Sequence, residues 1–163
     1  MKWLSWLAFV ILFASCTTTY YVVRHADRLN NTDGSPLSPT GHARAAILRD
    51  TLQSKGIDSI FTSTYLRTQQ TAQPLATATG LNMVIYLKDT TDGLIKRLKK
   101  INGKDVLVVG HTDNVPAIVL GLSGQQVPPI TGDDFDNLYI IRVKKCLNVR
   151  RSLVHTTYGP PSP

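Results

Sequence analysis

The sequence is poor in aromatic residues, in cysteine and in metal-ligand patterns, and each shortage excludes a class of protein. Aromatic residues make up 7% of the chain, and no base-reading motif or long basic stripe accompanies them, so nucleic-acid binding is not expected. The two cysteines are too few for a disulfide framework. The four histidines have no metal-ligand spacing among themselves or with the cysteines, which argues against a zinc cluster.

What is present describes an ordinary globular protein with a basic charge balance. The 163 residues are 42% apolar and 18% charged, which fits one domain with a sizeable core. The formal net charge of +7 favours anionic partners, among them phosphorylated substrates and lipid headgroups. The charge alone does not choose between these partners.

The first sixteen residues, MKWLSWLAFVILFASC, differ from the rest of the chain. Lys2 is followed by an apolar run over residues 3–14, which is shorter than the roughly 20 residues of a membrane-spanning helix. A basic start, a short apolar run and small residues at the end are typical of a secretory signal. We therefore predict a signal peptide over 1–16, a domain over 17–157, and a loose tail, YGPPSP, over 158–163.

Between residues 20 and 156, strand-like and helix-like patterns alternate. Such alternation predicts βαβ units, and hence an α/β three-layer sandwich with a mainly parallel central sheet, helices on both faces and a C-terminal hairpin. The run DVLVVG, with no polar alternation, is typical of a central strand buried on both faces. The predicted strands are 20–23, 58–63, 81–87 and 105–110, the helices are 40–56, 65–80 (kinked at Pro74), 91–103 and 114–124, and the hairpin strands are 137–143 and 148–156.

Basic side chains follow several of these strands directly. Arg24 and His25 end the first strand, Arg28 follows three residues after His25, Arg67 opens the helix after the second strand, and His111 ends the fourth strand. Ligands of parallel sheets bind at the carboxyl ends of the strands, where these side chains would meet. Arginine forks and helix N-termini there favour an anion, and a phosphoryl group fits best.

Four segments, in order, resemble the motifs of the histidine phosphatase superfamily, also called the phosphoglycerate-mutase-like fold. The first resembles the family's Arg-His-Gly motif, and the second its Leu-Thr-x-x-Gly segment. The third is similar to its Ser-x-x-x-Arg-x-x-Gln-Thr segment, and the last to the segment of its second histidine. The segments are VVRHADR, PLSPTGHARAAIL, IFTSTYLRTQQTA and VLVVGHTDNVPAIVLGL, and the resemblance extends over residues 20–143.

The resemblance implies a role for each basic residue. His25 would be the nucleophile that forms a phosphohistidine, which water then hydrolyses. Arg24, Arg67 and His111 would bind the phosphoryl oxygens and stabilise the transition state, so that neither a metal nor a cofactor is needed. Arg28 stands where the acid-phosphatase branch has a further phosphate-binding arginine. The chain accordingly has no Walker loop and no acidic magnesium cluster.

Two positions differ from or extend the family pattern. Ala26 replaces the glycine that usually follows the nucleophilic histidine, and alanine can take this place if its φ is negative. Asn31 lies six residues after His25, where the mutase branch has a polar substrate contact, and is therefore a candidate binding residue.

A general acid that protonates the leaving group is harder to choose. The mutase branch uses a glutamate after the third strand, where this chain has Asp89 and Asp92. The acid-phosphatase branch uses an aspartate after the second histidine, and here Asp113 comes one residue late. Asp27 lies beside the nucleophile. We expect Asp89 to be the acid, with the others as alternatives, and a substrate with a good leaving group would need none.

The end of the signal segment, FASC, resembles the lipobox of bacterial lipoproteins, with Phe13 in place of the usual leucine. The resemblance implies lipidation of Cys16, export, and a membrane-anchored lipoprotein of a bacterial cell envelope. Cys146 would then be a free thiol in the hairpin turn. Ordinary signal cleavage and an uncleaved anchor are the alternatives.

These observations predict a metal-independent phosphatase that hydrolyses phosphomonoesters. A mutase is disfavoured because residues 80–110 leave little room for the cap that mutases carry. Two alternatives stay open: a phosphohistidine phosphatase, and a non-catalytic lipoprotein that binds phosphorylated ligands.

Overall fold

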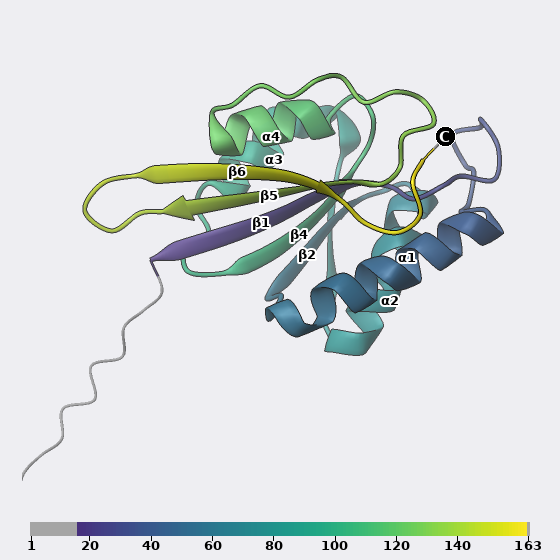
Figure 1. The fold of residues 1–163 in the computed structure, drawn as a ribbon, viewed down its shortest axis with the longest axis horizontal. Coiled ribbons are helices and arrows are strands. Elements are labelled where there is room, and N and C mark those ends of the chain that lie inside the picture. The colour runs from purple at the N-terminus through teal and green to yellow at the C-terminus, as the bar shows by residue number, and fades with distance from the viewer. Residues whose placement is uncertain (1–15, 163) are drawn as a thin grey trace, which may run out of the picture.

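The computed structural model describes residues 16–162, which form a six-stranded sheet between two pairs of α-helices (Figure 1). The predicted α/β class and the terminal hairpin are both confirmed. The strands are β1 Thr17–Arg24, β2 Ser59–Ser63, β3 Met83–Tyr86, β4 Asp105–Gly110, β5 Asn137–Lys144 and β6 Arg150–Thr157. The helices are α1 Pro39–Leu52, α2 Leu66–Thr79, α3 Thr91–Leu98 and α4 Val115–Ser123, with short 3-10 turns η1 Gln53–Lys55 and η2 Lys88–Thr90.

The strand order in the sheet is β3-β2-β4-β1-β5-β6. Strands β1 to β4 are parallel to one another, whereas β5 runs antiparallel to β1 and β6 antiparallel to β5. The parallel strands therefore end at one edge of the sheet, and the turn between β5 and β6 lies at the opposite edge, beside the start of β1 (Figure 1).

Two apolar layers hold the helices against the sheet. Leu48 and Leu52 of α1 and Leu75 of α2 pack on one face, and Leu94, Leu98 of α3 and Ile118, Val119, Leu122 of α4 pack on the other. Helix α2 runs through Pro74 and ends, as predicted, at Gly80, whose φ of 69° suits a residue without a side chain. Helix α1 begins where the Ser38 hydroxyl accepts a hydrogen bond from the Gly41 amide.

The first strand is longer than predicted. It begins at Thr17 rather than at residue 20, because each of its first three threonines has a partner in β5, from Thr17 with Lys144 to Thr19 with Arg142. Threonine is also well suited to a strand. No spacer therefore separates Cys16 from the sheet.

The tail after β6 is not loose, which corrects the prediction for residues 158–163 as far as Ser162. The Tyr158 side chain is buried, and its amide donates to the carbonyl of Asp136. Ser162 accepts a hydrogen bond from the Phe135 amide and donates its own amide to the Asp136 carboxylate. The tail is thus fastened to the loop that precedes β5.

Cys16 and Cys146 form a disulfide that connects the start of β1 to the turn after β5. The prediction of a free Cys146 thiol is therefore wrong. Pairing of Thr17 with Lys144 places the two cysteines, 130 residues apart in sequence, with their Cα atoms 5.5 Å apart. The Cys16 sulfur that forms this bond cannot carry a lipid at the same time. The rest of the predicted signal, residues 1–15, lies outside the described residues.

Within residues 16–162, no helix combines the length and apolar character that crossing a bilayer requires.

Candidate active site

A cavity of about 280 Å³ lies at the edge of the sheet where β1 and β4 end. Five basic residues predicted from the sequence meet there, three from the end of β1 and its loop, one from α2 and one from the end of β4. Such convergence follows from the parallel arrangement of the strands. The lining residues are Arg24, His25, Arg28, Asp33, Arg67, Lys88, His111, Thr112, Asp113 and Gly132.

The His25 ring is held in the orientation that a nucleophile needs. The side chain is only 3% exposed, and its Nδ1 donates to the Ala26 carbonyl at 2.8 Å. Because Nδ1 carries the proton, Nε2 keeps its lone pair. Burial, followed by the charges of Arg24, His111 and Arg67, lowers the pKa of His25 to about 3, so the ring is neutral at neutral pH.

Alanine fits the position after the nucleophile. Ala26 is fully buried, and no residue other than glycine has a positive φ in the described chain, so the expected negative φ is confirmed. Its amide donates to the Thr71 hydroxyl at 2.9 Å, and this hydroxyl donates to the Arg67 carbonyl within α2. The backbone that carries His25 is therefore tied to the helix that carries Arg67.

Arg24 connects the pocket to the loop before β5. Its Nη1 donates to the carbonyls of Thr131 and Asp134, and its Nη2 donates to that of Gly132. The guanidinium also stacks on the Phe135 ring, with its carbon 4.1 Å from the ring centre. Burial, then the neighbouring Arg28, lowers the pKa of Arg24 to about 10, which leaves it charged at neutral pH. Three of its five donors thus shape the wall of the pocket.

His111 and Arg67 form a second hydrogen-bonded unit. Arg67 Nη2 lies 3.4 Å from His111 Nδ1, and the Ser63 hydroxyl lies 2.8 Å from His111 Nε2. Because arginine only donates, Nδ1 accepts and the Nε2 proton points to Ser63. Burial, followed by the charge of Arg67, lowers the pKa of His111 to about 4. His111 is 5.5 Å from His25 between ring centres.

The arginines leave buried donors without partners. The Nε atoms of Arg24 and Arg67 are buried and have no hydrogen-bond partner within residues 16–162. Arg28 lies close enough to both to lower the pKa of each, although burial is the larger cause. A buried group of cations with unpaired donors is costly unless an anion neutralises it. The arrangement can therefore bind an oxyanion such as phosphate.

Lys88 was not predicted from the sequence. It follows β3 within a run of polar residues that gave no motif, and the structure brings it to the pocket as an ion pair with Asp113, with Nζ and Oδ2 2.9 Å apart. Burial acts to raise the pKa of Asp113, but the hydrogen bond and charge of Lys88 prevail and lower it. Asp113 is thus an ionised carboxylate at neutral pH rather than a proton donor.

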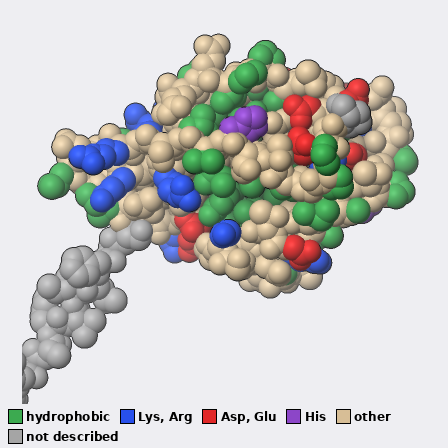
Figure 2. All heavy atoms as spheres, in the orientation of Figure 1, with side chains coloured by type: hydrophobic (Ala, Val, Ile, Leu, Met, Phe, Trp, Pro, Cys, Tyr) green, Lys and Arg blue, Asp and Glu red, His purple; other side chains and the backbone are tan. Residues whose placement is uncertain are grey.

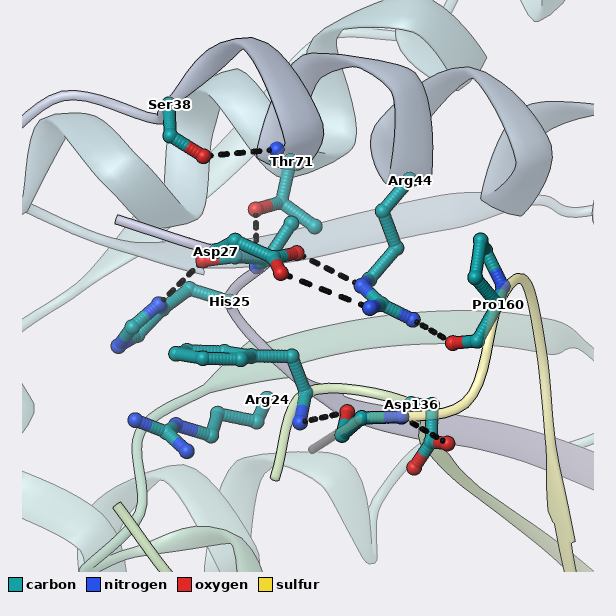
Figure 3. A network of polar contacts seen from close by, with 12 residues as sticks. Arg24, His25, Asp27, Ser38, Arg44, Thr71, Asp136 and Pro160 are labelled. Carbon is teal, nitrogen blue, oxygen red and sulfur yellow. Dashed lines mark hydrogen bonds and ion pairs between the residues drawn. The ribbon is translucent and has the colours of Figure 1, made fainter. Parts of the chain in front are cut away.

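The other candidate acids do not line the pocket. Asp89 and Asp92 are exposed on η2 and at the start of α3, and neither is among the lining residues. Asp27 points instead to Arg44 of α1, with a carboxylate oxygen 2.7 Å from Nε (Figure 3). Asn31 is exposed in the loop after β1 and does not line the pocket either.

The C-terminal tail supports the site from behind, as Figure 3 shows. Arg44, which is 2% exposed, pairs with Asp27 and also donates from Nη1 to the carbonyls of Tyr158 and Pro160. The tail in turn holds Phe135, whose ring lies against both Arg24 and His25. The tail thus positions the Phe135 ring that packs behind Arg24 and His25.

Within residues 16–162, no group of three histidine, cysteine or acidic side chains is placed to hold a metal ion.

The fold and the site together define a class: an α/β protein with a neutral buried histidine among arginines at the carboxyl edge of its sheet. A family model described as histidine phosphatase superfamily (branch 1) matches residues 20–90, which include His25, Arg28 and Arg67 but not His111. Proteins named "Probable phosphoglycerate mutase GpmB" from Yersinia pestis and Yersinia pseudotuberculosis are 37% identical over 71 residues. That match covers 39% of this chain and spans 33% of those relatives.

Solved structures resemble the chain over most of its length. The protein histidine phosphatase SixA, complexed with tungstate, matches with a TM-score of 0.66 at 18% identity, over 85% of this chain and 96% of that one. A mycobacterial glucosyl-3-phosphoglycerate phosphatase in complex with VO3 gives a TM-score of 0.67 at 15% identity, over 86% and 99%. Part of the sequence is thus similar to the histidine phosphatase superfamily, and the fold is similar to that of phosphatases of known structure.

Proposed function

We propose that the chain is a metal-independent phosphatase that hydrolyses phosphomonoesters through a phosphohistidine on His25. The observation that carries this proposal is the His25 ring, whose Nδ1 proton is held by the Ala26 carbonyl while Nε2 keeps its lone pair beside the cationic pocket. A neutral imidazole is a nucleophile, whereas a protonated one is not. The match of residues 20–90 to the histidine phosphatase superfamily model supports the same chemistry.

The reaction would proceed in two steps. His25 Nε2 attacks phosphorus, and the bond from phosphorus to the ester oxygen breaks. Arg67 and Arg28 bind the phosphoryl oxygens, where charge is concentrated in the transition state, and His111 orients Arg67 through its Nδ1. A water molecule then attacks the phosphohistidine, breaks the bond from nitrogen to phosphorus, and releases inorganic phosphate and the free imidazole.

None of the acids predicted from the sequence is placed in the pocket as a proton donor, which favours substrates whose leaving group departs without an acid. Asp113 is ionised by its pairing with Lys88, and Asp89 does not line the cavity. Aryl phosphates, acyl phosphates and phosphohistidine meet this condition. A phosphohistidine phosphatase is therefore the second candidate function, and the structural likeness to SixA agrees with it.

The test is phosphate release from an aryl phosphate by the parent and by His25→Ala, each with a chelator present. We expect turnover in the parent, none in the variant, and a phosphorylated protein after an alkaline quench, since phosphohistidine is labile in acid. Loss of activity on adding chelator would contradict metal independence. Phosphate binding with no turnover on aryl phosphate, acyl phosphate or phosphohistidine would instead establish a non-catalytic binding protein.

Export and membrane attachment through residues 1–16 belong to the same proposal and rest on the sequence of that segment. Lipidation of Cys16 and its disulfide with Cys146 use the same sulfur and exclude each other. The mass of the protein recovered from the membrane of a producing bacterium distinguishes them: a lipidated chain is heavier by its acyl groups and retains a reactive Cys146 thiol, whereas the disulfide form has no reactive thiol.

A further inference from the structure

The end of the domain opposite the active site gathers cations and exposed apolar side chains. The starts of β1, β2 and β4 lie at this end, as does the turn between β5 and β6, because Thr17 pairs with Lys144 (Figure 1). The active site lies at the other end of β1, roughly 25 Å away for a strand of this length. The chain enters the sheet here, at Cys16.

Lys104 at this end pairs with Asp58, but six further cations here take part in no ion pair within residues 16–162. We call them the basic end: Lys99, Lys100, Lys144, Lys145, Arg150 and Arg151. The Lys145 ammonium connects the turn to the end of α3 by donating to the carbonyls of Lys99 and Ile101. Figure 2 shows blue side chains in separate groups at this end of the molecule, near the hairpin turn.

Two of these cations repel each other across the hairpin. Lys144 and Arg150 are directly paired in the register of β5 and β6, and both are exposed. Like charges in directly opposite positions destabilise a sheet. The arrangement would be stabilised by an anionic surface outside the molecule.

Apolar side chains lie at the tip of the same hairpin. Leu147 is 99% exposed and Val149 is 57% exposed. Exposed aliphatic side chains flanked by lysine and arginine are typical of segments that enter the interface of an anionic bilayer. A nucleic acid would gain nothing from the exposed Leu147, so the combination of cations and aliphatic side chains favours a lipid surface.

We infer that the hairpin tip and the basic end form a docking surface for an anionic membrane. Leu147 and Val149 enter the headgroup region, while Lys144, Arg150 and Arg151 contact lipid phosphates. The active site then faces away from the bilayer and receives its substrate from the aqueous side. This inference does not depend on the catalytic proposal.

The test uses the full chain with a single tryptophan as a depth probe. The two native tryptophans, Trp3 and Trp6, are replaced by phenylalanine, and one tryptophan is introduced at the hairpin tip by Leu147→Trp. The matched control is Leu29→Trp, a position 58% exposed in the loop at the active-site end. Vesicles contain phosphatidylcholine with brominated acyl chains, with or without phosphatidylglycerol, and quenching of fluorescence is measured.

We expect the tryptophan at the tip to be quenched on anionic vesicles and the control tryptophan not to be. Adding Lys144→Gln and Arg150→Gln should raise the lipid concentration needed for half-maximal quenching roughly 25-fold. This value assumes a loss of about fivefold for each cation removed at an anionic surface. The variant Lys96→Gln removes an exposed cation of α3 outside the basic end and should change that lipid concentration less than about threefold.

Three results would overturn the inference. One is equal quenching at both tryptophan positions, and another is quenching at the tip that is unchanged by loss of the two cations. The third is a dimer in sedimentation without lipid that Leu147→Ser abolishes, because the hairpin would then bind a second copy of the chain.

Discussion

Asp27 lies two residues from the nucleophile, and its replacement by asparagine tests whether it supports the structure or takes part in the reaction. Its carboxylate accepts from Arg44 Nε at 2.7 Å and from Nη2 at 3.5 Å, and Arg44 is 2% exposed. Removing one partner of a buried ion pair usually costs 3–5 kcal/mol, and since Asp27 is 18% exposed we take the lower end, about 3 kcal/mol. The expected change is in the free energy of unfolding, with little change in the pH profile of kcat.

The assay is urea unfolding with the disulfide intact, alongside phosphate release at several pH values. Because Arg44 also donates to the carbonyls of Tyr158 and Pro160, Asp27→Asn should weaken the packing of the tail but leave the tail bound to Arg44. The double variant Asp27→Asn with Arg44→Met should be at least about 1 kcal/mol more stable than the sum of the single losses predicts, since no buried charge is left unpaired. Stability within about 1 kcal/mol of the parent, combined with loss of one limb of the pH profile, would refute this reasoning and make Asp27 the acid.

Three further predictions concern other parts of the site. Stability should be greatest above pH 6.5 and should fall as the pH drops towards about 4 and then 3. Burial lowers the pKa values of His111 and His25 in the folded chain, so the unfolded chain takes up protons first. Urea midpoints at several pH values check this, and a flat profile would contradict it. Gly41→Ala should destabilise the fold by more than about 2 kcal/mol, since the added carbon would overlap the Asp27 carbonyl. Gly34→Ala is the control, because nothing lies within 4 Å of its added carbon, and it should be nearly neutral. Comparable unfolding curves for the two variants would be inconsistent with this packing. Ser63→Ala should lower kcat/KM roughly tenfold, because it removes the hydroxyl that accepts the His111 proton. Ser63→Thr keeps a hydroxyl and should restore kcat/KM, and failure to do so would point to a packing effect.

The sequence predicts the elements well because their periodicity is local. The predicted strand DVLVVG has the same first and last residues as β4, and Gly80 ends α2 as predicted. Basic residues at strand ends could be assigned to one site because parallel strands end together, and Arg24, His25, Arg28, Arg67 and His111 do line one cavity.

What could not be predicted depends on contacts between distant segments. The pairing of Cys16 with Cys146 follows from the register of β1 and β5, which no local pattern specifies. Lys88 reaches the pocket only through its pairing with Asp113. The prolines and glycine of the tail predict a loose segment, but the buried Tyr158 side chain holds the tail against the domain. In each case tertiary packing decides a position that composition leaves open.

The central place of β1 has a consequence for the order in which the protein can fold. This strand is made first, yet its two neighbours in the sheet, β4 and β5, begin at Asp105 and Asn137. Until those residues leave the ribosome, both edges of β1 lack hydrogen-bond partners, and the pairing that completes it closes a long loop. The region around β1 therefore stays unpaired for most of the synthesis of the domain, and the sheet can close only after β5 has emerged.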